Sequence, residues 1–114
     1  MDRHLKAHLF DIETAIGEVY SFFEQVPKRF DEYQNNLMLR RAIERNIGII
    51  GEAINKLLKE NPDIAITNAK AIIATRNRVI HDYAAVTDDV MWKIVVNDLP
   101  KLKEEVSSLL SNEA

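Results

Sequence analysis

The 114-residue sequence contains no cysteine, which excludes disulfide bonds and thiolate metal ligands and suits a reducing cytoplasm. It also lacks any apolar run near the roughly 20 residues that cross a membrane. Its charged first ten residues, M-D-R-H-L-K-A-H-L-F, have no signal-peptide core. We therefore expect a cytoplasmic protein.

Positive charge is not in excess. Lysine and arginine number 15 against 18 aspartate and glutamate residues, which gives a net charge of −3 and a pI near 5.6. A chain of this charge has no general basic surface for holding nucleic acid by counterion release. Any contact with RNA or DNA must be local, for example where a few arginines of two subunits converge in one cleft.

Glycine is scarce, with three residues, and there is no sustained two-residue alternation, so nothing indicates a β-strand. Hydrophobic residues make up 46% of the chain and charged residues 29%, an ordinary globular balance. The length suits one domain that spans residues 1–114.

Helical periodicity, in contrast, is plentiful: apolar residues recur every three or four positions. The first such stretch predicts a helix over about residues 3–26, capped by Asp2 and ended by Pro27. The second follows a capping pair, Asp31 with Gln34, and ends at Asn61-Pro62.

Two further helices follow the connector at 61–67. Thr67 or Asn68 caps the third, and Thr87 with two aspartates behind it begins the fourth. Pro100 removes a backbone donor, so we expect a kink near Val96 or a break. The predicted fold class is all-α, an antiparallel bundle of four to five helices.

Gly48 and Gly51 lie inside the second predicted helix. Each costs up to about 1 kcal/mol relative to alanine. A helix interior keeps such a residue for a reason, and a close crossing of another helix is the simplest. We therefore expect a neighbouring helix to approach closely there.

The third helix carries the stretch R-N-R-V-I-H-D-Y, residues 76–83. Arg76 begins on the buried stripe, and Tyr83, seven residues later, shares that face. A buried guanidinium needs a partner for its charge and its five donors. That partner is either a carboxylate or the phosphate of a ligand.

His81 lies about 140° round an ideal helix from Arg76, so their side chains meet only if the helix ends near Ile80 or a second subunit contributes. Together they could cleave a phosphodiester without metal. Histidine moves protons near neutral pH, and a guanidinium binds phosphate oxygens and stabilises developing charge. From spacing alone, a salt bridge plus a helix C-terminal cap explains the same residues.

This stretch resembles the R-x-x-x-x-H-x-Y motif of the HepT family, in the HEPN superfamily of helical domains paired with MNT-type minimal nucleotidyltransferases, and Asn77 also fits. R-A-I-E-R-N-I-G-I-I-G-E-A-I-N-K-L at 41–57 resembles the family's second helix. M-W-K-I-V-V-N-D-L-P-K-L at 91–102 resembles its last. The likeness covers nearly the whole chain.

The resemblance implies the toxin of a toxin–antitoxin pair, a homodimer whose two motifs face one cleft and cut RNA, such as tRNA, without metal or cofactor. Arg76 and His81 would be the catalytic pair. The nucleotidyltransferase antitoxin would transfer AMP to Tyr83 and block the cleft with bulk and charge. A phenol packed at a dimer seam explains this tyrosine equally well.

A charged set on the second helix, Arg41, Arg45 and Glu52, lies opposite the apolar stripe. It is either a solvated face or, on the family likeness, a support for the cleft, with an arginine on RNA phosphate and Glu52 orienting an arginine. The aromatic residues in helical runs are expected to pack rather than to stack on bases. These are Tyr20, Phe22, Phe23 and Trp92.

His4, His8 and Asp11 share one helix face at a spacing that could bind zinc, but a solvated face is the commoner outcome, and we predict no metal site. Two alternatives to a ribonuclease stay open. One is a non-catalytic helical HEPN module that binds a nucleotide or docks a nucleotidyltransferase. The other is a purely structural bundle in which an internal carboxylate pairs with Arg76.

Overall fold

The structure, a computed structural model, describes residues 2–81 and 87–111, and of residues 78–81 it describes the backbone alone. Within these ranges every regular element is helical, so the predicted all-α fold class is confirmed. The elements are α1 (Arg3–Phe22), α2 (Phe30–Gln34), α3 (Leu37–Glu60), α4 (Ala69–His81), α5 (Asp88–Lys93), the π-helical turn η1 (Ile94–Asp98) and α6 (Leu99–Ser111).

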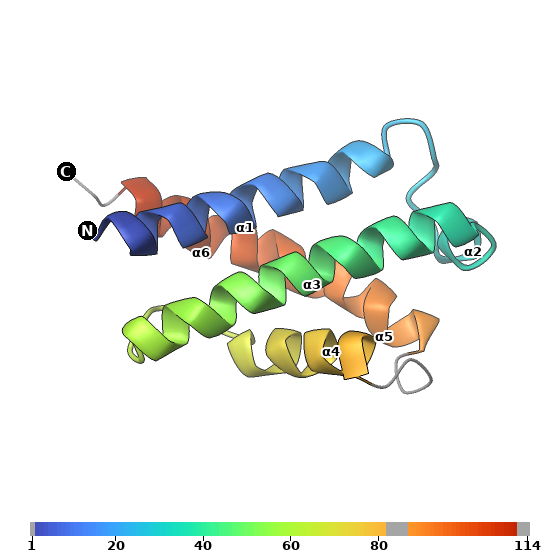
Figure 1. Cartoon of the computed structure of the whole chain (residues 1–114). Coiled ribbons are helices and arrows are strands. Elements are labelled where there is room, and N and C mark those ends of the chain that lie inside the picture. Colours follow the sequence, from blue (N-terminus) through green and yellow to red (C-terminus); the bar gives the residue numbers. More distant parts are fainter. Residues whose placement is uncertain (1, 82–86, 112–114) are drawn as a thin grey trace.

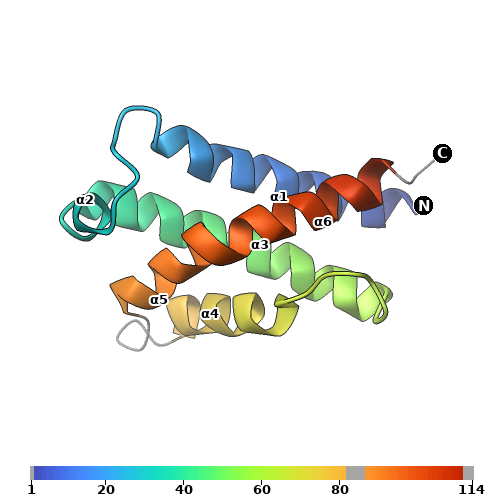
Figure 2. The same cartoon turned by 180° about the vertical axis from the view of Figure 1, so that it is seen from behind.

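The long helices form an antiparallel bundle (Figure 1). α3 lies in the middle and packs most extensively against α1 on one side and α4 on the other. Seen from behind, the continuous run of α5, η1 and α6 crosses the back of the bundle (Figure 2). None of the helices in the described ranges is long and apolar enough to cross a membrane.

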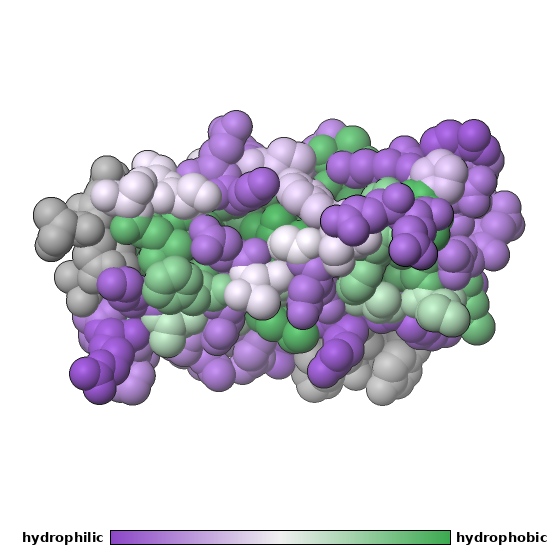
Figure 3. Space-filling view, turned by 90° about the horizontal axis from the view of Figure 1, so that it is seen from above, coloured by the Kyte–Doolittle hydropathy of each residue, from purple (hydrophilic) through white to green (hydrophobic). Residues whose placement is uncertain are grey.

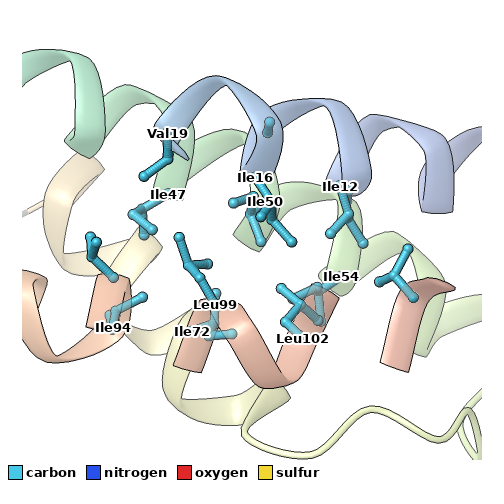
Figure 4. Close-up of a cluster of buried hydrophobic side chains, with 14 of the residues drawn as sticks. Ile12, Ile16, Val19, Ile47, Ile50, Ile54, Ile72, Ile94, Leu99 and Leu102 are labelled. Atoms are coloured by element: carbon cyan, nitrogen blue, oxygen red, sulfur yellow. The ribbon is translucent and has the colours of Figure 1, made fainter. Parts of the chain in front are cut away.

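Aliphatic side chains from α1, α3, α4, η1 and α6 point toward one another and form the core (Figure 4). Ten of them, all at most 3% exposed, are Ile12, Ile16, Val19, Ile47, Ile50, Ile54, Ile72, Ile94, Leu99 and Leu102. They are the residues at the three- and four-residue spacing of the sequence. On the surface above α1, hydrophilic side chains surround separate hydrophobic areas (Figure 3).

The boundaries of α1 agree with prediction at one end. The Asp2 carboxylate caps it by accepting from the backbone N–H of His4 at 2.8 Å. The helix ends at Phe22, before the predicted residue 26, because the N–H groups of Phe23 and Glu24 bond to carbonyls three residues back. This tight turn takes the chain out of the helix ahead of Pro27.

The predicted start of the second helix is wrong. Asp31 lies inside the short helix α2, and its carboxylate binds Arg29 at 2.7 Å instead of capping a long helix. Asn36, whose backbone is extended as a cap requires, begins α3 and accepts from the Leu39 N–H at 3.0 Å. The end of α3 at Glu60 agrees with prediction.

The irregularity expected near Val96 is present as η1. Pro100 cannot donate a backbone hydrogen bond, and the turn before it is widened, so that the Leu99 N–H donates to the carbonyl of Ile94, five residues back. The helix therefore continues into α6 without a break.

Four aromatic rings hold the α1–α2 connection against α5. Trp92 lies 5.4 Å from Tyr33 and 5.8 Å from Phe23 between ring centroids, and Phe30 contacts both Tyr33 and Trp92. Phe23 and Trp92 thus pack, as expected. Beside them, Arg40 of α3 pairs with Asp88 at 3.6 Å and ties α5 to the centre of the bundle.

Candidate functional site

The helix that carries the motif arginine is anchored at its start. The Thr67 N–H donates to Glu105 at 2.9 Å, and the Asn68 side-chain amide donates to Asp98 at 3.2 Å. Asn68 has a left-handed backbone, with φ 56°, and its carbonyl accepts from Ile72 at 3.1 Å. α4 thus begins where predicted, but the side chains of Thr67 and Asn68 bind η1 and α6 instead of capping it.

Arg76 lies on the face of α4 that packs against α3, and 21% of its side chain is exposed. Its guanidinium forms an ion pair with Glu52 of α3 and donates to the side-chain oxygen of Asn77 at 2.8 Å. Its Nε is buried and has no hydrogen-bond partner in the described part of the chain. The predicted partner for this arginine is therefore present, and it is a carboxylate on the neighbouring helix.

Gly51 allows this close approach. A Cβ at position 51 would lie 2.5 Å from the Cβ of Arg76 and 3.4 Å from the carbonyl oxygen of Ile72, so the expected close crossing is confirmed here. At Gly48 the expectation is wrong, because an added Cβ would meet nothing within 4 Å. Gly48 has no packing reason and borders an open space instead.

That space is a cleft of about 520 Å³ between α1, α3 and α4. α1 contributes His8 and Asp11, and α4 contributes Arg76. The apolar lining comes from Gly48, Ile49 and Ala53 of α3. The remaining lining is charged and also belongs to α3: Glu44, Arg45, Glu52 and Lys56.

Of the three charged residues singled out on α3, two line this cleft, Arg45 and Glu52. Arg41 points its charge elsewhere, to Glu44 at 2.9 Å, in an exposed ion pair. Glu52 also lies 3.9 Å from the Lys56 ammonium, so one carboxylate serves two cations. The structure thus brings Arg45, Glu52 and Arg76 to one hollow.

His81 is the last residue of α4 that the structure describes, and its side chain lies outside the described residues. Tyr83 lies outside them altogether. The pairing of Arg76 with His81 and the modification of Tyr83 therefore stay predictions.

His8 and Asp11 line the cleft, a placement that the sequence did not reveal. Their helical spacing indicated a shared face, but which face of α1 meets α3 is decided by tertiary packing. Among the described residues, no group of three or more histidine, aspartate or glutamate side chains could hold a metal ion.

The sequence comparisons identify the family. A family model described as ribonuclease HepT-like matches residues 12–109. The chain belongs to the HepT-like ribonuclease family. It is an RNase-like family of the HEPN superfamily. No solved structure matches the chain at a significant level.

Curated relatives of the HepT-like chain span nearly its full length. It is 37% identical over 108 residues to "Putative RNase MJ1380" of Methanocaldococcus jannaschii, covering 91% of this chain and 94% of that one. It is 30% identical over 113 residues to "Probable ribonuclease HepT" of Thermococcus cleftensis, covering 96% and 98%. A third, "Putative RNase TTE0752" of Caldanaerobacter subterraneus, is 31% identical over 104 residues, covering 90% and 93%.

Proposed function

We propose that this protein is a metal-independent endoribonuclease, the toxin of a HEPN/MNT toxin–antitoxin pair. The observation that carries the proposal is the state of Arg76. The motif arginine of a ribonuclease-named family is largely buried at a cleft, with its charge balanced by one carboxylate and with donors left over. A phosphate that enters the cleft can bind the remaining donors of Arg76.

The donors of Arg76 can be counted. A guanidinium has five N–H groups, and the described contacts, to Glu52 and Asn77, use one at each terminal nitrogen. Two terminal N–H groups and the buried Nε–H remain. Glu52 compensates the charge of Arg76 while no substrate is bound. The arginine can therefore stay partly buried at the cleft without an unpaired charge.

The chemistry needs a proton acceptor, a proton donor and a group that stabilises the negative charge on the phosphate oxygens in the transition state. His81 accepts the proton of the RNA 2′-hydroxyl, and O2′ attacks phosphorus as the P–O5′ bond breaks. The leaving O5′ takes a proton from a protonated imidazole, that of the partner subunit's His81 when two motifs share one cleft. Arg76 binds the non-bridging oxygens, and the products carry a 2′,3′-cyclic phosphate and a 5′-hydroxyl.

Control of this activity follows from Tyr83, two residues after His81. A nucleotidyltransferase antitoxin that transfers AMP to its hydroxyl adds bulk and a negative phosphate two residues along the sequence from the catalytic histidine. An RNA phosphate is then repelled from Arg76. We extend the proposal to this modification and to a homodimer as the active form.

The test is RNA cleavage by the purified dimer in excess chelator, after mass spectrometry has shown no AMP on Tyr83. Wild type should produce cyclic-phosphate ends, and Arg76→Ala and His81→Ala should not. His4→Ala and Arg29→Ala are matched controls, since both residues are exposed and neither lines the cleft. Absence of cleavage by the unmodified wild type contradicts the proposal.

The ion pair of Arg76 with Glu52 favours a second candidate, a non-catalytic HEPN module that binds a nucleotide or docks a nucleotidyltransferase. In that module the pair would be a structural contact that also recognises phosphate. Growth arrest on expression separates the two candidates. If the protein is a ribonuclease, His81→Ala abolishes the arrest. If it is a binding module, the wild type causes no arrest and His81→Ala still binds the nucleotidyltransferase partner.

A further inference from the structure

The cleft between α1, α3 and α4 extends well beyond the reach of one phosphate on Arg76. Its volume of about 520 Å³ lies within the ordinary range for small-molecule sites, about 300–1,000 Å³. We infer that it is a nucleobase pocket, which receives the base of an RNA nucleotide whose phosphate lies on Arg76. The inference rests on the proposed function for its ligand, RNA, and adds the subsite that selects it.

Gly48 is the first observation. Glycine costs about 1 kcal/mol in a helix interior, and here no neighbour requires it, since an added Cβ would have no contact within 4 Å. Gly48 lines the cleft. The missing side chain leaves part of the cleft open beside this stretch of α3.

The second observation is the apolar character of this stretch. Ile49 is 37% exposed although it is a large aliphatic residue in a well-packed helix, and it lines the cleft with Gly48 and Ala53. An aliphatic surface of this kind suits the face of a planar base, which is apolar, while the ring edges carry the polar groups.

Charge is the third observation. Arg45, Lys56 and Arg76 are three cations in the lining, and Asp11, Glu44 and Glu52 are three anions, so that the formal sum is zero with His8 neutral. A second phosphate would gain little in a hollow of balanced charge. A neutral group with donors and acceptors at its edge gains more, because both kinds of partner are at hand.

The carboxylates further restrict the base. Glu44 and Glu52 are engaged by arginines, whereas Asp11 has no hydrogen bond or ion pair to a described residue. An ionised carboxylate only accepts hydrogen bonds. At ring position 4 cytosine offers an amino donor where uracil offers an oxygen acceptor, so between these two pyrimidines a carboxylate of Asp11 that faces this position favours cytosine.

The experiment is a titration of the full-length, isotope-labelled protein with CMP and with UMP, followed by amide NMR. We expect CMP to shift the resonances of Gly48 and Ile49 and to bind more tightly than UMP. Gly48→Leu fills the pocket and should weaken CMP binding by about tenfold or more. Gly17→Leu is the matched control, since Gly17 is an exposed helix glycine whose added Cβ also meets nothing, and it does not line the cleft.

Each result has a separate meaning. No CMP-dependent shift at Gly48 and Ile49, or equal binding by Gly48→Leu and Gly17→Leu, overturns the pocket. Equal affinity for CMP and UMP, unchanged in Asp11→Asn, overturns the role of Asp11. The titration measures binding without cleavage, so a failed ribonuclease assay and a failed pocket are distinguishable.

Discussion

The start of the Arg76 side chain lies too close to Gly51 for any side chain at position 51. An added Cβ at position 51 would lie 2.5 Å from the Cβ and 2.9 Å from the Cγ of Arg76. The close approach of Arg76 to α3, where its guanidinium pairs with Glu52, therefore requires glycine at position 51. The same close contact between α3 and α4 therefore both packs the two helices and places the guanidinium of Arg76.

Replacement of Gly51 by alanine should move α4 away from α3. Both blocking atoms belong to the rigid start of the arginine side chain, so the helices must separate. We expect a loss of about 1–3 kcal/mol in the free energy of unfolding, measured by urea denaturation. RNA cleavage should fall as well, because Arg76 is displaced.

Gly48→Ala is the control for this prediction. Its new methyl group meets nothing, and the helix gains up to about 1 kcal/mol from the better helix former. The two variants should therefore change stability in opposite directions. Equal effects of both substitutions would contradict the role assigned to Gly51.

The fold was largely accessible from the sequence because each long helix has one uninterrupted apolar stripe. The prediction that the second long helix starts at Asp31 was wrong, because a capping pattern of residues does not show whether the backbone there is extended or helical. Asn36 had the required conformation and became the cap. Several polar residues could have capped α3, and Asn36 is the one that has the extended backbone and binds the Leu39 N–H.

The site was accessible only in part. The position of Arg76 on the buried stripe predicted a partner, and the family likeness indicated that Glu52 orients an arginine without saying which one. Arg76 and Glu52 lie 24 positions apart, so no local spacing identifies them as a pair. The contribution of His8 and Asp11 depends on how α1 is rotated against α3. Helical spacing in the sequence shows which residues share a face of a helix, but it does not show how that helix is rotated relative to a distant one.

Glu52→Gln tests whether Glu52 positions Arg76 for catalysis. The amide keeps the size of the side chain but loses its charge, so the guanidinium is less firmly held and also has less competition for phosphate. We expect kcat for RNA cleavage to fall about tenfold while KM does not rise. Both side chains are partly exposed, so stability should change by only about 0.5 kcal/mol.

Asp31→Asn is the matched control, since it weakens the exposed pair with Arg29 at the start of α2, and neither residue lines the cleft. Its cleavage kinetics should equal those of wild type. A rise in KM with unchanged kcat in Glu52→Gln would instead assign Glu52 to substrate binding.

Asn46 joins α1 to α3 through a buried side chain, 3% exposed. Its amide donates to the carbonyl of Ala15 at 3.1 Å and to the Glu18 carboxylate at 3.0 Å. Asn46→Ala should lower the free energy of unfolding by about 1–3 kcal/mol more than Asn55→Ala, which gains the same helix propensity on the same helix. Equal urea midpoints for the two variants would show that these bonds contribute nothing net.

Tyr33 is fully buried, and its hydroxyl has no hydrogen-bond partner in the described part of the chain. Burial, reinforced by the negative charges of Asp88 and Glu44, raises the pKa of this hydroxyl above its ordinary value of 10.0. Tyr33→Phe keeps the ring contacts with Trp92 and removes the unsatisfied group. At neutral pH we expect it to raise the free energy of unfolding by about 1 kcal/mol.

The advantage of Tyr33→Phe should grow at high pH. A folded pKa above the unfolded pKa means that the unfolded tyrosine loses its proton first, so wild type loses stability as the pH rises above about 10. Phenylalanine has no such proton. Urea midpoints of wild type and Tyr33→Phe should diverge between pH 8 and pH 11, about the ordinary tyrosine pKa, whereas those of wild type and Tyr20→Phe should diverge less, because Tyr20 is partly exposed. Parallel midpoints for Tyr33→Phe across that range would mean that the hydroxyl reaches water in the folded protein.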